Sequence, residues 1–267
     1  MSAPLALKTP PGVLGEIVAR TQHDVALREA KTPLDALQAG LKSDCRGFAR
    51  ALQAPGIGLI AEFKPRSPSR GELRPGAIPE GIAAIYKPFA SAISVLCDGP
   101  YFGGSHRALG RVRGVVDCPV LCKDFIVSRY QVVEARAHGA DAVLLMASLL
   151  PKESLGTLLA LTHALGMDAL VEVHDQQELG EAVESGAKVI GVNSRDLHTL
   201  KIDTERARGL LAQVPTSKVR VAESGLNHRP QVEALEGLAD AALIGSALMS
   251  APDPAAKIRQ LGWTPCL

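Results

Sequence analysis

The stretch Leu59-Ile60-Ala61-Glu62-Phe63-Lys64-Pro65-Arg66-Ser67-Pro68-Ser69-Arg70-Gly71 decides where the fold begins and where its site lies. An apolar run from Ile57 to Phe63, broken by one glycine and one carboxylate, predicts a buried strand. Glu62 and Lys64 are two residues apart, so on a strand they project from the same face. The Pro, Ser, Arg and Gly residues that follow are typical of an exposed loop. A charged pair under such a loop favours the active site of an α/β protein; for the pair alone, a simple salt bridge is the alternative.

The remaining chain alternates between short β-rich runs and helical patterns. After the first strand, further strands are predicted at 93–96, 120–123, 142–145, 169–173, 189–193, 219–223 and 242–244. Helical patterns occupy 78–86, 105–113, 129–138, 153–165, 176–185, 204–213 and 230–238. Eight strands, each followed by a helix, predict a single (β/α)8 TIM barrel. A doubly wound open sheet is the alternative, but no G-x-G-x-x-G follows the first strand.

Helical segments also precede the first strand. Residues 12–30 carry apolar side chains at helical spacing, with charges on the other face, and shorter helices are expected from 33 and at 47–53. These segments lie outside the alternation, so residues 1–55 are predicted to form an N-terminal helical extension. No stretch of linker composition divides the chain, so 1–267 is expected to be one domain.

Composition argues against several classes of partner. The net charge of +1 and the aromatic content of 3% disfavour a nucleic-acid surface, and no apolar stretch is long enough to span a bilayer. The N-terminus lacks a charged segment followed by an apolar one, so no signal peptide is expected. Cys97, Cys118 and Cys122 lie in or beside apolar runs and are interpreted as reduced packing residues of a cytoplasmic protein. Cys118 and Cys122 are four apart, without a second pair or a nearby histidine, which argues against a zinc site.

Polar residues gather at the predicted carboxyl ends of the strands, the face on which a barrel carries its active site. Those expected there are Glu62, Lys64, Lys123, Glu172, Asn193, Arg195 and Glu223. Carboxylates and lysines at one barrel mouth perturb one another's protonation and can supply general acids and bases. Taken singly, Lys123 could be a surface lysine, and Glu172 could be the partner in an ordinary ion pair.

The loops after the last two strands have a different character. Ser224-Gly225 and Gly245-Ser246 are small residues that expose backbone N–H groups. In barrels, these loops and a short helix N-terminus often hold a phosphate, although small residues also make plain tight turns. His174 follows the fifth strand and is expected to orient Glu172 or to face solvent. The remaining histidines considered are expected to be solvated: His106, His138, His163, His198 and His228.

A series of longer motifs follows in a consistent order. They are Ile60-Ala61-Glu62-Phe63-Lys64, Ser67-Pro68-Ser69-Arg70-Gly71, Ser94-Val95-Leu96-Cys97-Asp98, Phe102-Gly103-Gly104, Pro119-Val120-Leu121-Cys122-Lys123-Asp124-Phe125-Ile126, Leu170-Val171-Glu172-Val173-His174, Gly191-Val192-Asn193-Ser194-Arg195-Asp196-Leu197, Glu223-Ser224-Gly225 and Leu243-Ile244-Gly245-Ser246-Ala247-Leu248-Met249. With them the chain resembles the indole-3-glycerol-phosphate synthases of tryptophan biosynthesis over nearly its whole length. It departs from the family where Cys97 replaces a usual Thr, Cys122 a usual Arg, Ser194 a frequent Asn and Ala90-Ser91 a usual Gly-Ala.

The resemblance implies a lyase that closes 1-(2-carboxyphenylamino)-1-deoxyribulose 5-phosphate to indole-3-glycerol phosphate, losing CO2 and water. It implies a phosphorylated small-molecule substrate and neither a metal nor an organic cofactor. Matched to the family, Lys123 is the general acid, Glu172 is the base, and Lys64 holds the carboxylate that leaves as CO2.

The resemblance assigns supporting roles as well. It implies that Glu62 and Asn193 orient a lysine and substrate hydroxyls, and that Glu223 tunes the lysines. The implied substrate and phosphate contacts are Ser67, Arg195, Ser224, Gly225, Gly245 and Ser246. Another phosphate-binding barrel, such as phosphoribosylanthranilate isomerase, and a non-catalytic ligand-binding paralogue are the alternatives. The expected protein is cytoplasmic, a monomer or weak homodimer, with no nucleic-acid or membrane partner.

Overall fold

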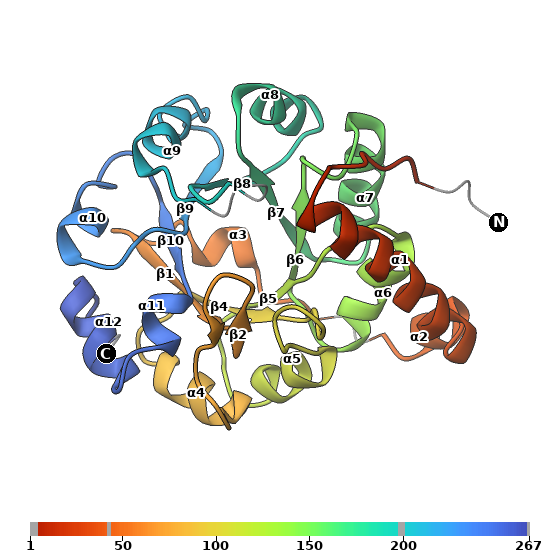
Figure 1. Cartoon of the computed structure of the whole chain (residues 1–267), viewed down its shortest axis with the longest axis horizontal. Helices are drawn as coiled ribbons and strands as arrows, with labels where there is room; N and C mark the ends of the chain where they lie inside the picture. Colours follow the sequence, from red (N-terminus) through yellow and green to blue (C-terminus); the bar gives the residue numbers. More distant parts are fainter. Residues whose placement is uncertain (1–4, 42–43, 197–200, 266–267) are drawn as a thin grey trace.

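The computed structural model describes residues 5–41, 44–196 and 201–265. Its centre is a closed barrel of eight parallel strands in the order β1-β10-β9-β8-β7-β6-β5-β4, viewed end-on in Figure 1. The strands are β1 Gly58–Phe63, β4 Ala92–Leu96, β5 Val120–Lys123, β6 Ala142–Met146, β7 Asp168–Val173, β8 Val189–Asn193, β9 Val219–Glu223 and β10 Ala241–Ile244. The predicted (β/α)8 barrel is therefore confirmed.

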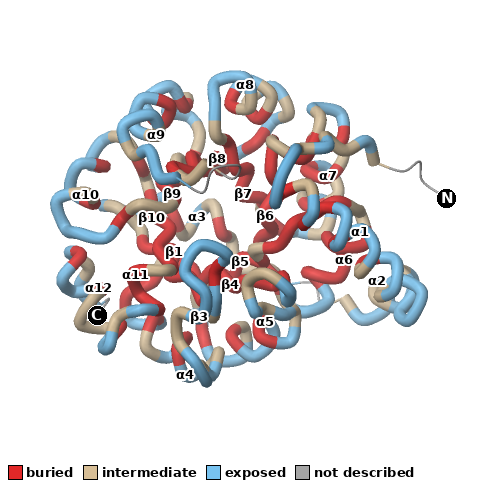
Figure 2. The backbone as a smooth tube through the Cα atoms, in the orientation of Figure 1, coloured by how far each residue is buried: buried red, intermediate tan, exposed pale blue. Residues whose placement is uncertain are grey.

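Helices surround the barrel and precede it. They are α1 Val13–Lys31, α2 Leu34–Ala39, α3 Phe48–Ala51, α4 Pro79–Tyr86, α5 His106–Arg113, α6 Arg129–Ala137, α7 Lys152–Ala164, α8 Gln176–Glu184, α9 Thr204–Leu211, α10 Arg229–Glu233, α11 Ser246–Met249 and α12 Pro254–Leu261. Figure 2 shows the buried backbone following the ring of strands, with exposed backbone on the outer helices and loops. Among the described residues, no helix is both long and apolar enough to cross a membrane.

Several helices begin at a side chain that suits the end of a helix. A serine or aspartate lies just before the first turn, and its oxygen accepts a hydrogen bond from a backbone N–H that has no partner within the helix. Such caps begin α5, α6, α8, α9 and α12, at Ser105, Ser128, Asp175, Asp203 and Asp253. These local signals fix where the loops after β4, β5, β7 and β8 end, at the carboxyl ends of the strands.

Differences from the predicted elements are local. The loop after β1 contains a small antiparallel hairpin, β2 Arg66–Ser67 and β3 Gly71–Glu72, where irregular backbone was expected. Gly71 allows this turn because its φ of +66° is open to glycine at little steric cost. Helix α10 ends at Glu233 rather than near 238, because the chain continues in tight turns up to Gly237, whose φ is +75°.

The amino-terminal end of the barrel is closed by the segment before β1. Phe48 in α3 and Leu52 just after it are fully buried, and the Ala49 N–H donates to Asp168 Oδ2 over 2.9 Å at the start of β7. The side chain of Asp141 precedes β6 and is fully buried. It accepts hydrogen bonds from the backbone N–H groups of Arg46 (2.8 Å) and Val120 (2.9 Å). Backbone donors therefore hold the carboxylates at this end.

Candidate active site

A pocket of about 670 Å³ opens at the carboxyl ends of the strands. Every candidate site residue named from the sequence lines it: Glu62, Lys64, Ser67, Lys123, Glu172, Asn193, Arg195, Glu223, Ser224, Gly225, Gly245 and Ser246. The barrel thus brings together side chains separated by up to 184 positions in the chain, from Glu62 to Ser246.

Lys123 lies between two carboxylates. Its Nζ is 2.6 Å from Glu172 Oε2 and 2.7 Å from Glu223 Oε2. The lysine side chain is 11% exposed and the two glutamates 3% and 2%. Charge-assisted hydrogen bonds this short, away from water, are stronger than surface ion pairs and fix the lysine nitrogen in position.

Lys64 forms a second ion pair in the pocket. Its Nζ is 2.7 Å from Glu62 Oε1, and the hydroxyl of Ser94 donates to Glu62 Oε2 over 3.4 Å. A Cβ on Gly245 would lie 2.2 Å from Glu62 Oε1, and a Cβ on Gly191 would lie 2.1 Å from Glu223 Oε1. These two glycines therefore provide the space that the buried carboxylates occupy.

The cluster of two lysines and three glutamates carries one excess negative charge when every member is ionised. Burial alone raises the pKa of Glu172, but Lys123, His174 and Asn193 outweigh it and hold that pKa well below its usual value. Burial and the neighbouring Glu172 charge raise the pKa of Glu223 to about 8, against the opposing effect of Lys123. Lys123 is also buried, yet its carboxylate partners raise its pKa. The excess charge is thus relieved by a proton on Glu223.

His174, just after β7, and Asn193, at the end of β8, lie beside Glu172. His174 Nε2 is 3.5 Å from Glu172 Oε1, and its Nδ1 is 3.2 Å from Glu178 Oε2. Burial lowers the pKa of His174, but these carboxylates more than compensate and raise it. The contact with Glu172 fits the expectation that His174 orients this residue. Asn193 Oδ1 accepts the N–H of Arg195 over 2.9 Å, which fixes the amide side chain.

The expectation that the remaining histidines are solvated is wrong for His106. Its side chain is 12% exposed because the first turn of α5 packs against β5 and α6. His138 and His228 are exposed as expected, His163 is half-buried, and His198 lies outside the described residues.

The loops after β9 and β10 form the far wall of the pocket. Ser224 has a φ of +66° and Gly225 one of +76°. Left-handed backbone at a serine is uncommon and is found most often at functional sites. A Cβ on Gly225 would lie 2.9 Å from Thr204 and 3.0 Å from Ile202, so this close approach requires glycine. Helix α11 begins at Ser246, where the first N–H groups of a helix lack intrahelical acceptors.

Cationic and unpaired polar groups face the pocket beside this wall. Burial, reinforced by the charge of Arg70, lowers the pKa of Arg195, so two guanidinium groups share this rim. Ser67 is 6% exposed, and its Oγ has no hydrogen-bond partner among the described residues. A buried hydroxyl without a partner is costly unless a ligand completes its bonding.

The sequence argument missed the apolar side of the pocket. Leu14 and Ile17 in α1 line it, together with Phe102 and Phe125, whose ring centroids are 5.9 Å apart. The helical spacing of apolar residues in 12–30 indicated a buried face but not what it covers. Helix α1 is therefore part of the pocket as well as part of the extension.

The fold and this pocket define a class of protein: a (β/α)8-barrel enzyme whose mouth is equipped for proton transfer and for an anionic substrate. Its architecture is shared with 3-hexulose-6-phosphate synthase, which is 16% identical with a TM-score of 0.62, covering 77% of this chain and 98% of that one. At that identity, the likeness shows the fold alone.

Sequence comparisons identify the family. The family model for indole-3-glycerol phosphate synthase matches residues 14–261. Indole-3-glycerol phosphate synthase of Saccharopolyspora erythraea is 44% identical over 93% of this chain and 94% of its own length. Indole-3-glycerol phosphate synthase 2 of Streptomyces coelicolor is 45% identical over 94% of this chain and 98% of its own. The tryptophan biosynthesis protein TrpCF of Yersinia pestis is 44% identical over 93% of this chain, which spans 52% of that relative. The chain belongs to the indole-3-glycerol phosphate synthase family, whose activity is that of a carbon–carbon lyase in tryptophan biosynthesis.

Proposed function

We propose that Lys123 and Glu172 carry the acid–base steps by which this lyase converts 1-(2-carboxyphenylamino)-1-deoxyribulose 5-phosphate to indole-3-glycerol phosphate. The observation that carries the proposal is the position of Lys123 Nζ, 2.6 Å from Glu172 and 2.7 Å from Glu223, inside the pocket. In the first step, the ring carbon bearing the carboxylate attacks the ketone carbon, and Lys123 protonates the ketone oxygen. Carbon dioxide then leaves and the ring regains aromaticity.

The second step is dehydration. Glu172 accepts a proton from the ring-closed intermediate, and Lys123 protonates the new hydroxyl, which leaves as water. The lowered pKa of Glu172 keeps this carboxylate ionised at neutral pH. Lys64 holds the substrate carboxylate before it leaves, and Glu62, 2.7 Å away, positions the lysine. Asn193 and Glu223 contact substrate hydroxyls.

The raised pKa of Lys123 raises the question of how it gives up a proton. A general acid works best with a pKa near the working pH, and Lys123 alone lies above that range. Glu223 holds a proton with a pKa of about 8 and is 2.7 Å from Lys123 Nζ. As Lys123 donates, the Glu223 proton moves to the lysine nitrogen and restores the ammonium. The pair therefore acts as one acid, and the buried lysine is never left neutral between two carboxylates.

The phosphate is assigned to the wall formed by Ser224-Gly225 and Gly245-Ser246. Backbone N–H groups at a helix start favour anions, and the two glycines let the backbone approach closely. Arg195 adds charge, and Ser67 offers its unpaired hydroxyl to the substrate. Inorganic phosphate should therefore compete with substrate, raising the apparent KM without changing kcat.

The aromatic ring of the substrate is assigned to the apolar side. Leu14, Ile17, Phe102 and Phe125 line the pocket together with the charged cluster and the anion-binding loops. A substrate with an aromatic ring at one end and a phosphate at the other fits this division. Helix α1 then has a role in binding, because two of these side chains come from it.

The proposal also covers the domain organisation, the cellular location and the oligomeric state. We infer one barrel domain over 1–267, with 1–55 as its extension, because α3 is buried against the barrel and α1 lines the pocket. The described cysteines are free thiols, which is typical of the cytoplasm. Large exposed apolar side chains are few and scattered among the described residues, which supports a monomer or weak homodimer.

Turnover tests the assignment directly. The purified chain is incubated with the carboxyphenylamino substrate, and the indole product is followed by its fluorescence. Indole formation and release of CO2 in equal amounts are expected. Binding of the substrate without turnover would instead favour a ligand-binding paralogue, and isomerisation of phosphoribosylanthranilate would favour the sister barrel.

A further inference from the structure

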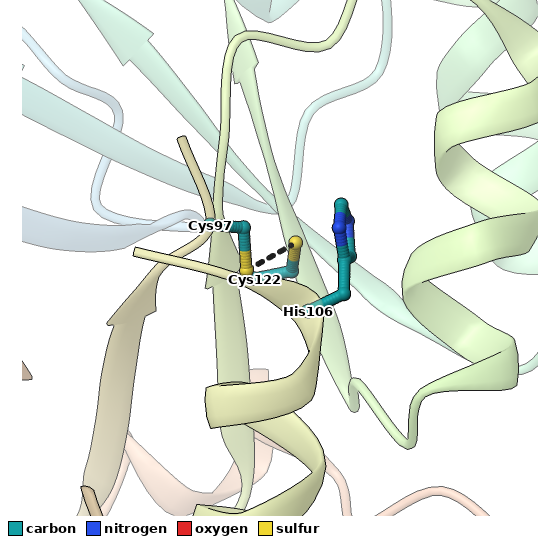
Figure 3. A group of neighbouring side chains, drawn as sticks. All are labelled: Cys97, His106 and Cys122. Atoms are coloured by element: carbon teal, nitrogen blue, oxygen red, sulfur yellow. Dashed lines mark hydrogen bonds between the residues drawn. The ribbon is translucent and has the colours of Figure 1, made fainter. Parts of the chain in front are cut away.

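A second group of reactive side chains lies outside the pocket. Cys97 follows β4, Cys122 is in β5, and His106 is the first residue of α5; Figure 3 shows the three side chains together. Their donor atoms all lie within 4.8 Å of one another, and the two sulfurs are 3.4 Å apart. Cys97 is 6% exposed and Cys122 1% exposed. The argument from sequence compared Cys122 with Cys118, but strand pairing places it beside Cys97 and His106.

Two carboxylates extend this group. His106 Nε2 is 3.8 Å from Asp124 Oδ2 and 3.9 Å from Glu134 Oε2. Glu134 comes from α6 and is 5% exposed; its other oxygen accepts a hydrogen bond from Arg28 over 2.8 Å. Neither His106 Nε2 nor Glu134 Oε2 has a hydrogen-bond partner among the described residues.

Core packing explains this arrangement poorly. Buried thiols can serve as small apolar side chains, but an imidazole nitrogen and a carboxylate oxygen buried without partners are each destabilising. Two sulfurs, one imidazole and one carboxylate are instead the donors that zinc prefers in proteins. Tetrahedral zinc with bonds of about 2.3 Å to sulfur sets the two sulfurs about 3.8 Å apart, close to the observed spacing.

We propose that Cys97, His106 and Cys122, whose donor atoms lie within 4.8 Å of one another, bind one zinc ion, and that the Glu134 side chain moves towards the ion to become the fourth ligand. Binding replaces the two thiol protons, which are released to solvent, so uptake of one Zn²⁺ releases two protons and involves no oxidation. Four protein ligands leave no position for water, so the site is structural rather than catalytic.

The site is separate from the reaction. Successive side chains on a strand face opposite sides, so Cys122 points towards the helices while Lys123 lines the pocket. The ion would link four segments: the residue after β4, strand β5, the first residue of α5, and helix α6. It would therefore stabilise the wall of the barrel from which Lys123 extends.

Metal titration of the reduced, metal-free full chain tests the proposal. Cobalt(II) should bind one ion per chain and give thiolate charge-transfer and tetrahedral ligand-field absorption, and zinc should abolish both. Cys122→Ser should lose the charge-transfer absorption and the rise in Tm that zinc produces. Cys118→Ser, which removes a half-buried thiol outside the group, should retain both. Glu134→Gln should keep the charge-transfer absorption but change the ligand-field bands.

His106→Asn provides a second variant in case Cys122→Ser does not fold, which circular dichroism would show. It should weaken cobalt binding at least tenfold while retaining thiolate charge transfer. The proposal is overturned if the parent binds no cobalt after full reduction, or if Cys122→Ser or His106→Asn binds it as tightly as the parent. A Cys97–Cys122 disulfide, with no metal uptake by the reduced chain, would also overturn it.

Discussion

Both ends of the barrel bury carboxylates, but the two ends surround them with different partners. At the amino-terminal end, Asp141 accepts two backbone N–H groups and lies 3.3 Å from Arg113. At the carboxyl-terminal end, Glu172 and Glu223 share one lysine, and Glu223 Oε1 has no hydrogen-bond partner among the described residues.

The two ends differ in whether the partner of the carboxylate can exchange a proton with it. A backbone N–H holds a carboxylate in place but cannot transfer its proton, so such a pair contributes only to stability. A lysine between two carboxylates can exchange protons with both, and a shifted pKa is the consequence. Substitutions at the amino-terminal end of the barrel should therefore change stability, and substitutions at the carboxyl-terminal end should change the catalytic rate.

Removing the shared cation should have the largest effect. Lys123→Ala should lower kcat by ~10²–10⁴-fold, the usual contribution of a general acid, with a smaller change in KM. Fluorescence-detected turnover of the folded variant measures this. Lys87→Ala is the control, because Lys87 is 45% exposed and pairs with exposed Asp117. Near-normal turnover in Lys123→Ala would remove the acid role.

Glu172→Gln should have the second-largest effect on kcat. Glutamine keeps the shape of the side chain but cannot accept the proton, so kcat should fall by ~10²-fold or more, with KM little changed. Rapid-quench analysis should show a ring-closed intermediate accumulating. A kcat within about threefold of the parent would be incompatible with a base, given the size of that contribution.

Asp141→Ala tests the other end of the barrel. It leaves two buried N–H groups without acceptors, so the free energy of unfolding should fall by roughly 2–4 kcal/mol. Urea unfolding at pH 7.5 measures this, above the pKa of about 6 to which burial raises this carboxyl. The kcat of the folded variant should match the parent. Asp117→Ala, at an 86% exposed side chain, is the control and should change stability little. A rate defect in Asp141→Ala without loss of stability would contradict the comparison.

Of the three pocket variants, Glu223→Gln should have the smallest effect on rate, and its pH dependence should be distinct. In the parent, kcat should fall as pH rises through about 8, because the proton that reloads Lys123 is then lost. In the variant this alkaline decline should disappear, and kcat at neutral pH should fall less than the ~10²-fold caused by losing the acid itself. An unchanged alkaline decline would exclude Glu223 as its source.

The same group predicts a pH effect on stability. The folded pKa of about 8 lies above the ordinary 4.5, so the native state holds a proton that the unfolded chain releases between these values. The contribution is complete below pH 4.5 and is lost as pH rises through 8. The parent should therefore lose more unfolding free energy between pH 5 and pH 9 than Glu223→Gln. An equal loss in both proteins would contradict the raised pKa.

Local signals predicted much of the fold. The strands β5, β8 and β9 begin and end as expected, because each is a short β-rich run bounded by polar or small residues. The charged cluster followed from one rule, that strand ends converge, applied to Glu62, Lys123 and Glu172. The pocket-lining role of helix α1 and the group around Cys97 were not predictable in this way. Their surroundings depend on which distant segments pack together, and neither helical spacing nor cysteine spacing encodes that.

Gly191 and Gly245 have a consequence for how this pocket can change. Each leaves space for a carboxylate of an adjacent strand, since a Cβ would lie 2.1 Å from Glu223 Oε1 or 2.2 Å from Glu62 Oε1. A single methyl group at either position would therefore displace an acid that is itself unaltered in sequence. A mutant library meant to vary substrate choice while keeping turnover should hold these two glycines fixed along with the acids. Conversely, a methyl group at Gly191 offers a way to shift the protonation of Glu223 without replacing any charged residue.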